Sequence, residues 1–340
     1  MALAGTWPAP SPAPRRVLML GATGTIGRAT AGALAARGHE VISIVRQPPA
    51  TLSALWPQSP SLPGRILLRQ ADVTNAASFQ ADGLRGERFD ALVSCLASRS
   101  GAPADAWAID HKAHCNALAA AQAAGVRQVV LLSAICVQRP RLSFQQAKLA
   151  FEAVLRESGL LHSIVRPTAY FKSLSGQLGR LREGKPFLIF GNGALTACKP
   201  ISDADLAAYL AECLDEEARW NRILPIGGPG PALTPRQQGE LLFAALGREP
   251  RFRSMPVGLL DAIIGGLSLG GRFSPRLAAK AELARIGRYY ATESMLVLDP
   301  ATGRYDADAT PETGTDTLAA FYGRLVRGEE SIDRGEHAVF

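Results

Sequence analysis

The stretch that decides the fold runs from Val17 to Arg37 and reads VLMLGATGTIGRATAGALAAR. Its first four residues are apolar, which is typical of a buried strand, and its Ala-rich second half predicts a helix. Between them, three glycines stand where the chain must turn tightly and where the first amides of the helix remain unpaired. Such amides bind anions, so we expect the turn to hold the pyrophosphate of a dinucleotide. The residues assigned to this turn are Gly21, Thr23, Gly24, Thr25, Ile26 and Gly27.

Short apolar runs alternate with helical stretches from residue 15 to residue 166. Strands are expected at 17–20, 41–45, 65–69, 91–95, 129–133 and 162–166, and helices at 26–37, 107–124 and 142–158. This alternation predicts an α/β fold, a doubly wound parallel Rossmann sheet with helices on both faces. We assign 15–166 to the dinucleotide-binding domain and 167–327 to a smaller C-terminal substrate-binding region whose chain returns to the sheet. Residues 1–14 are expected to be a disordered leader, and 328–340 a flexible tail.

Composition and charge argue against several classes of protein. The chain has 340 residues and a formal net charge of +7, but its Lys and Arg residues are scattered, which disfavours nucleic acid as a partner. Its five cysteines lie far apart without a CxxC pair, so neither a metal site nor a disulfide framework is expected, and a reducing cytoplasm fits best. The longest apolar stretch, 255–271, is shorter than the ~20 residues that a membrane-spanning helix needs. A peripheral membrane contact is left open.

The residues after the second and third strands indicate which cofactor binds. Arg46 stands where an NAD enzyme places Asp or Glu against the ribose 2′-hydroxyl. A cation there suits a 2′-phosphate, so NADPH is the expected cofactor, and a solvated loop arginine is the alternative. Asp72 and Val73 follow the third strand, where such folds present a carboxylate and the next amide to adenine. An N-cap or turn role is the alternative for Asp72.

The glycine spacing, the Asp-Val pair and a strand that ends at Ser133 before a lysine-bearing helix resemble the short-chain dehydrogenase/reductase superfamily, in its atypical extended branch. Members usually carry Tyr-x-x-x-Lys on that helix, with Tyr as the acid and Lys on the nicotinamide ribose. Here the segment reads Phe144-Gln-Gln-Ala-Lys148, so the lysine is kept and the tyrosine is absent. The resemblance implies that Lys148 orients the nicotinamide, with a surface helix lysine as the alternative.

Longer stretches narrow the resemblance. Among them are LLSAICVQRP at 131–140, SIVRPTAYFKSLSGQ at 163–177 and ESMLVLDPATGRYDAD at 293–308. They resemble the divinyl chlorophyllide 8-vinyl reductases, a family that uses NADPH to reduce the 8-vinyl group of a magnesium tetrapyrrole to ethyl in chlorophyll or bacteriochlorophyll synthesis. The resemblance implies a divinyl chlorophyllide or protochlorophyllide substrate. The short leader, without a plastid targeting peptide, suggests the cytoplasm of a photosynthetic bacterium, either peripheral to the photosynthetic membrane or free of it.

Reduction of a vinyl group makes different demands from reduction of a ketone. The macrocycle can spread the charge that hydride addition leaves, so the missing tyrosine acid is chemically tolerable. A proton must still reach the second vinyl carbon. Tyr170 and Lys172, just beyond the sixth strand, are the candidate donors, with water as a rival. Alternatively, Tyr170 packs in the core and Lys172 neutralises a substrate propionate.

Three further features of the sequence each have more than one interpretation. His111 and His114 stand beside Asp110 on one expected helix, but a polar face or a subunit contact is favoured over a metal because no third ligand is evident. The apolar stretch 255–271 is expected to be either a partly exposed wall for the substrate or an ordinary core helix. The function itself has two rivals: a reductase of the isoflavone-reductase or NmrA-like kind that acts on another conjugated molecule, and an NADPH sensor without turnover.

Overall fold

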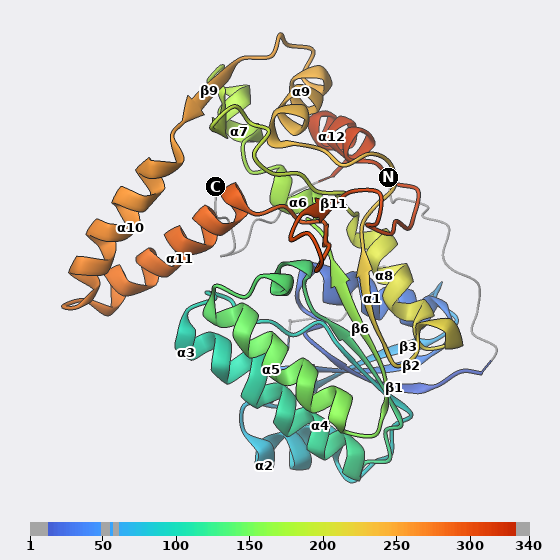
Figure 1. The fold of residues 1–340 in the computed structure, drawn as a ribbon. Helices are drawn as coiled ribbons and strands as arrows, with labels where there is room; N and C mark the ends of the chain where they lie inside the picture. Colours follow the sequence, from blue (N-terminus) through green and yellow to red (C-terminus); the bar gives the residue numbers. More distant parts are fainter. Residues whose placement is uncertain (1–12, 49–54, 57–60, 331–340) are drawn as a thin grey trace.

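The computed structural model describes residues 13–48, 55–56 and 61–330, so residues 1–12 of the expected leader and 331–340 of the expected tail lie outside the described residues. At its centre is a seven-stranded sheet in the order β3-β2-β1-β4-β5-β6-β8, in which every neighbouring pair is parallel (Figure 1). The strands are β1 (Arg16–Leu20), β2 (Glu40–Val45), β3 (Arg65–Gln70), β4 (Ala91–Ser94), β5 (Gln128–Leu132), β6 (Leu161–Pro167) and β8 (Arg222–Ile226). The prediction of a doubly wound parallel sheet is therefore confirmed. The strand order reverses between β1 and β4, and in such sheets ligands bind outside the carboxyl ends of the strands at this point.

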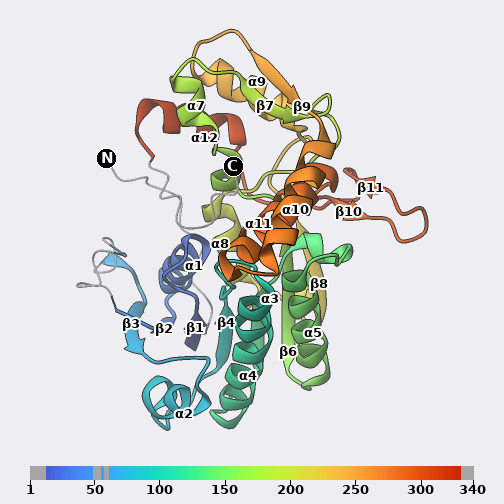
Figure 2. The same ribbon diagram turned by 90° about the vertical axis from the view of Figure 1, so that its left-hand side faces the viewer.

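Helices cover both faces of the sheet (Figures 1 and 2). On one face, α1 (Thr25–Ala36) packs beside α8 (Asp203–Glu212). On the other face lie α4 (His114–Ala123) and α5 (Ser143–Glu157). Because both faces of the strands are covered, the central strands are continuously apolar and each face has its own cluster of buried side chains.

The single helix expected at 107–124 begins four residues earlier, at Pro103, and consists of three successive pieces. A short helix, α3 (Pro103–Ala106), leads into a π-helix over Trp107–Ala113, and α4 follows. The wider π turn carries Asp110, whose exposed fraction is only 1%. Single π turns inside longer helices are frequent at functional sites. Two smaller helical pieces in the first half are α2 (Ala76–Ser78) and the π-helix Phe79–Leu84.

Beyond β6 the chain builds a layer over the carboxyl ends of the strands (Figure 1). Its elements share a separate apolar core, and they are α6 (Phe171–Leu174), α7 (Leu178–Arg182), β7 (Phe187–Phe190), α9 (Pro235–Ala245), β9 (Phe252–Met255) and α12 (Leu318–Arg327). Between α7 and α9 the chain returns to the main sheet as α8 and β8. A two-stranded sheet of β10 (Val297–Leu298) and β11 (Tyr305–Asp306) precedes α12.

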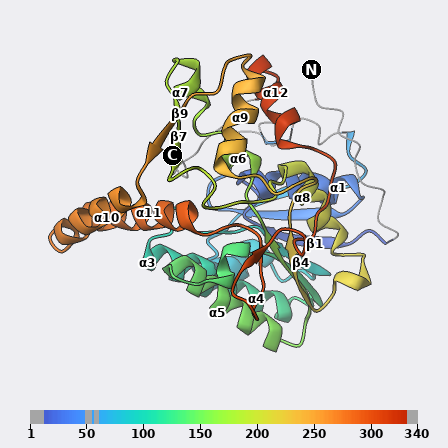
Figure 3. The same ribbon diagram turned by 45° about the horizontal axis from the view of Figure 1, so that its top comes forward.

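The helices α10 (Val257–Gly271) and α11 (Pro275–Thr292) form a hairpin that projects from the body of the molecule (Figures 1 and 3). The turn leaves little room beside Gly271, where an added Cβ would lie 3.1 Å from the Ala278 Cα. No residue of α10 is buried. The core-helix alternative for this stretch is therefore wrong. No helix in the described part of the chain is long and apolar enough to cross a bilayer.

Candidate active site

Two glycines of the turn after β1 are required by the packing of the protein itself. Gly21 has a φ of +75°, and an added Cβ would lie 2.6 Å from the backbone of Cys95 at the end of β4. At Gly27 an added Cβ would lie 2.0 Å from the Gly21 carbonyl oxygen. These close approaches bring α1 against β1 and β4, so neither position accepts a side chain without a shift of the backbone.

Gly24 has a different environment. It is the N-cap of α1 with a φ of −74°, and an added Cβ would make only an ordinary contact of 3.5 Å with the Gly21 carbonyl oxygen. The fold therefore does not require glycine at residue 24. Having no side chain, Gly24 provides no side-chain cap for α1, a helix with no acidic residue in its first turn. Both facts fit a turn that leaves its amides open to an anionic ligand.

A lysine and a carboxylate from the C-terminal half face the glycine turn. The Lys172 Nζ, on α6, donates to the Thr25 hydroxyl at 2.9 Å. Asp203, the first residue of α8, has a buried Oδ1 that finds no hydrogen-bond partner among the described residues. Burial raises the pKa of Asp203 from 3.8 to about 6, although the charges of Lys172 and Arg28 oppose the rise. Lys172 thus lies beside the first turn of α1, at the crevice outside the carboxyl ends of β1 and β4 where ligands bind in such sheets.

Lys148 belongs to a buried ion pair. Its Nζ lies 2.9 Å from the Asp110 Oδ1, and the exposed fractions of the two side chains are 12% and 0%. The Asp110 carboxylate also accepts the Ser98 amide at 3.4 Å, so this pair connects the loop after β4 to α5. One turn earlier on α5, Phe144 is buried in an apolar cluster with Ile286 of α11. The position that carries the acid in the resembling superfamily therefore holds a packed phenyl ring.

Ser133, at the end of β5, is held by a second buried carboxylate. Its hydroxyl donates to the Glu152 Oε1 at 2.5 Å, and the Arg166 Nε donates to the same oxygen at 3.2 Å. Because Glu152 has this ion pair and hydrogen bond, its charge is compensated although it is buried. The network connects β5, α5 and β6 just below the crevice.

Tyr170 and Tyr290 place two phenols beside Cys136. Burial raises the pKa of Tyr170, and the neighbouring Cys95, Asp203 and Cys136 add to the rise. Tyr290 is 38% exposed, its hydroxyl lies 3.9 Å from the Cys136 sulfur, and burial raises its pKa well above the usual value. Tyr290 comes from the base of α11, more than a hundred residues away in sequence, and sequence reasoning missed it.

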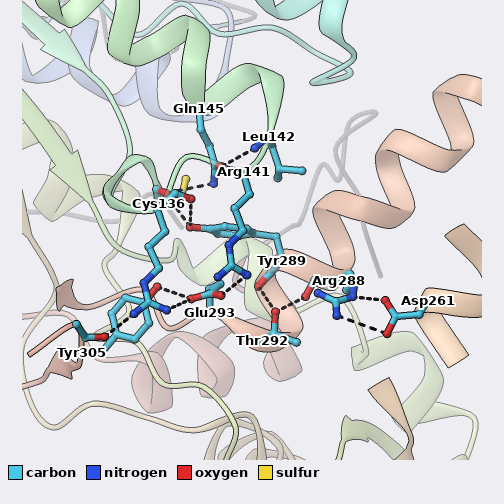
Figure 4. Close-up of polar contacts among 12 residues, drawn as sticks. Cys136, Arg141, Leu142, Gln145, Asp261, Arg288, Tyr289, Thr292, Glu293 and Tyr305 are labelled. Atoms are coloured by element: carbon cyan, nitrogen blue, oxygen red, sulfur yellow. Dashed lines mark hydrogen bonds and ion pairs between the residues drawn. The ribbon is translucent and has the colours of Figure 1, made fainter. Parts of the chain in front are cut away.

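The inner end of α11 is fixed to the loop after β5 (Figure 4). The Tyr289 hydroxyl donates to the Cys136 carbonyl oxygen at 2.8 Å. Glu293, which is 5% exposed, pairs with Arg139 at 3.1 Å and Arg141 at 2.8 Å. These contacts determine where Tyr290 lies relative to the crevice.

The candidates after β2 and β3 lie near one another on the surface. Arg46 and Asp72 are exposed, and the charge of Arg46 contributes to a lowered pKa of Asp72. The main cause of that lowering is a hydrogen bond from the Thr74 hydroxyl, which is 2.6 Å from the Asp72 Oδ1. Asp72 therefore makes a turn with Thr74, whereas Asn75 caps α2. Val73 packs into the core beneath the turn.

His111 and His114, the two histidines considered as metal ligands in the sequence, both contact other residues of the fold. The His114 Nε2 lies 2.9 Å from the Ser94 hydroxyl, and its Nδ1 lies 2.9 Å from the Ile109 carbonyl oxygen. Burial lowers the pKa of His114 to about 4, so the ring is neutral at pH 7. His111 contacts the Trp107 ring edge-on and lies 3.8 Å from the Cys115 sulfur. Residues 13–48, 55–56 and 61–330 contain no group of three potential metal ligands.

Comparison with known proteins gives the family of this chain. Residues 21–217 match a family of NAD(P)H-binding domains. The divinyl chlorophyllide a 8-vinyl-reductase of Oryza sativa subsp. indica is 46% identical over 97% of this chain and 83% of its own length, and the Arabidopsis thaliana one is 46% identical over 93% and 78%. The chain belongs to the divinyl chlorophyllide a 8-vinyl-reductase family. The family resemblance inferred from the sequence is thus confirmed.

Solved structures show the fold that this vinyl-reductase chain shares with other reductases. An NADPH-dependent quinone oxidoreductase from Escherichia coli has a TM-score of 0.61 at 20% identity, covering 91% of this chain and 99% of its own. The leucoanthocyanidin reductase of Vitis vinifera has a TM-score of 0.64 at 15% identity, covering 92% and 99%. At these identities the likeness concerns the fold alone.

Substitution of Gly27, which the packing requires, and of Gly24, which the packing does not require, should have different effects. Gly27→Ala should lower the melting temperature markedly or prevent folding, because its Cβ would overlap the Gly21 carbonyl. Gly24→Ala should keep the melting temperature within a few degrees, yet weaken NADPH binding at least about tenfold, because its methyl would face the bound phosphates. Thermal melts and fluorescence titration with NADPH measure the two effects. Wild-type NADPH affinity in Gly24→Ala would contradict the assignment.

Asp203 makes stability depend on pH. Its folded-state pKa is raised, so the ionised form destabilises the protein, and the stability present below about pH 4 is lost as the pH rises through about 6. Asp203→Asn should therefore melt like the wild type at pH 4 and be more stable at pH 8 by on the order of 2–3 kcal/mol. Asp205→Asn on the same helix is the control and should lose stability at pH 8, because Asp205 accepts the Thr315 and Asp316 amides. Equal gains of Asp203→Asn at both pH values would contradict the prediction.

Proposed function

We propose that this protein uses NADPH to reduce the 8-vinyl group of divinyl chlorophyllide, or of divinyl protochlorophyllide, to an ethyl group. The relatives named for this reaction match the chain over nearly its whole length. Within the site, the main support is that Lys148 of the superfamily motif is present, whereas the buried Phe144, one turn earlier, replaces its tyrosine. A ketone reductase needs an acid where the phenyl ring lies, whereas a vinyl group conjugated to a macrocycle does not. Free thiols at all five cysteines fit a reducing cytoplasm, which we propose as the location, in a photosynthetic bacterium.

The residues around the glycine turn suit the phosphates and riboses of NADPH. The amides of the first turn of α1 would bind the pyrophosphate, and Lys172, which already donates to Thr25, would add a positive charge there. Lys148 would donate to the nicotinamide ribose, oriented by its ion pair with Asp110. Arg46 would bind the 2′-phosphate at the other end of the crevice. Bound NADPH supplies the hydride.

We assign delivery of the proton to Tyr170 and binding of the phosphates to Lys172. The Tyr170 phenol is protonated at neutral pH, so its hydroxyl has a proton to donate, although burial raises its pKa and makes it a weaker acid. Tyr170 follows β6 and lies near Cys95, the residue after β4, so it would face the nicotinamide. Lys172 donates to the Thr25 hydroxyl instead, so it would lie beside the phosphates. Tyr290, the second phenol beside Cys136, would border the macrocycle.

The reaction is tested with the purified protein, NADPH and divinyl chlorophyllide, followed by absorbance and by chromatography of the pigment. Wild type should form the 8-ethyl product, and Lys148→Ala should reduce turnover by roughly a hundredfold or more, because the nicotinamide is no longer oriented. Phe144→Tyr should bring little gain, since no ketone oxygen needs its hydroxyl. NADPH binding without any pigment reduction would overturn the proposal in favour of a sensor. A large gain from Phe144→Tyr would refute the role given to the macrocycle.

Cofactor choice depends on Arg46. Arg46→Asp should weaken NADPH binding about tenfold to a hundredfold while leaving NADH binding nearly unchanged, because a charge-assisted contact contributes roughly 1.5–3 kcal/mol. Arg127→Asp, at an exposed arginine before β5 at the opposite end of the sheet, is the matched control and should leave both affinities unchanged. Isothermal titration with each dinucleotide measures the ratio. An unchanged ratio in Arg46→Asp would remove Arg46 from the site.

A further inference from the structure

We propose that the α10–α11 hairpin docks this protein on the surface of an anionic lipid bilayer, with the turn around Phe273 entering the boundary between headgroups and acyl chains. This inference goes beyond the proposed reaction, because it concerns a surface outside the crevice and holds whichever pigment is reduced. The sequence left a peripheral membrane contact open, and the proposal assigns this contact to the α10–α11 hairpin.

The hairpin presents apolar side chains to solvent at its outer end. The Phe273 side chain is 87% exposed and that of Leu269 is 62% exposed, whereas Leu259 and Ile263, nearer the body, are about 40% exposed. Exposure therefore increases toward the turn. Beside Gly265 and Gly266 an added Cβ would meet nothing within 4 Å, so this part of α10 has no cover from the described part of the chain. Large apolar side chains that gather in the open on an isolated protein indicate an interaction site.

The charges at the same end are all positive. Arg272, Arg276 and Lys280 are exposed, and none of them lies in an ion pair of the described residues. The hairpin's two acidic residues both have arginine partners: Glu282 pairs with Arg285, and Asp261 pairs with Arg288. The outer end thus combines exposed aromatic and aliphatic groups with three cations, the combination that binds anionic lipid surfaces.

The geometry favours docking on the bilayer surface over insertion across the bilayer and over contact with a second copy of the chain. With 15 residues, α10 is about 22 Å long, shorter than the ~30 Å hydrocarbon core. A second copy of the chain on this turn would place three cations against three cations in a two-fold contact, which charge repulsion disfavours. A lipid headgroup layer supplies both the anions and the apolar interior that the turn lacks in water.

The contacts at the base of the hairpin mean that docking at its tip would also orient the crevice relative to the membrane. Tyr289 and Glu293, at the inner end of α11, are bound to the loop after β5 (Figure 4). Because Arg288 also pairs with Asp261 across the two helices, the hairpin is braced as one arm. A bilayer that holds the tip would therefore hold the crevice, with Tyr290 at its edge, at a set distance from the membrane surface.

Flotation of the purified protein with lipid vesicles tests the proposal. Wild type should float with phosphatidylglycerol/phosphatidylcholine vesicles at low salt, bind pure phosphatidylcholine vesicles much more weakly, and be partly released by 0.5 M salt. The double variant Leu269→Ser/Phe273→Ser and the triple variant Arg272→Glu/Arg276→Glu/Lys280→Glu should each lower the partition coefficient at least about tenfold. The triple control Arg127→Glu/Arg156→Glu/Arg222→Glu makes the same change of charge on exposed residues far from the hairpin and should bind nearly as wild type.

Melting temperature and NADPH affinity, expected to be unchanged in all variants, establish that each variant is folded. Wild type that fails to float with anionic vesicles overturns the proposal, as does equal loss in the distant control. If the tip variants bind vesicles as wild type but raise KM for the pigment in detergent solution, the tip is a substrate wall instead. If they turn a wild-type dimer into a monomer in light scattering without any vesicle effect, the tip covers a second copy. Flotation and light scattering do not depend on whether the pigment is reduced, so the docking proposal can fail independently of the proposed function.

Discussion

The close contact between α1 and the turn after β1 is the constraint on which the rest of the site depends. An added Cβ at Gly27 would lie 2.0 Å from the Gly21 carbonyl oxygen, and one at Gly21 would lie 2.6 Å from the backbone after β4. This packing fixes α1 on the sheet, and α8 packs on α1 in turn. The positions of Asp203 at the start of α8 and of Lys172 beside Thr25 therefore depend on Gly21 and Gly27. At these two glycines there is room for a hydrogen atom but not for a side chain.

Buried carboxylates beneath the crevice fall into two kinds. Asp110, Glu152 and Glu293 each have a cationic partner within hydrogen-bond distance, so their charges are compensated and they hold loops and helices in place. Asp203 differs, because one of its oxygens is buried without a partner and its pKa is raised. The unpaired carboxylate oxygen thus belongs to Asp203, whose pKa is influenced by Lys172 beside the first turn of α1, whereas the Asp110 carboxylate is paired with Lys148. Functional sites are where such uncompensated groups are expected.

The elements near the glycine turn could be predicted from sequence because their signals are local. The strand Arg16–Leu20 and the helix Thr25–Ala36 fall where the apolar run at 17–20 and the Ala-rich stretch at 26–37 predict them. The division of the helix at 107–124 had no local signal, and the partner of its Asp110 is Lys148, which lies on another helix, α5. Tyr290 was missed for the same reason. Its relation to Cys136 exists only after α11 packs on the loop that follows β5.

The strand β8, at one edge of the sheet, also bears on how neighbouring molecules can contact one another. Its residue Pro225 pairs with Arg166 of β6 on one side and has no amide hydrogen to offer on the other. Arg222, at the start of the strand, adds an exposed charge. Proline and charge at an open edge prevent another chain from extending the ladder. Neighbouring copies in a crowded cell therefore cannot join their sheets into a continuous one at this edge.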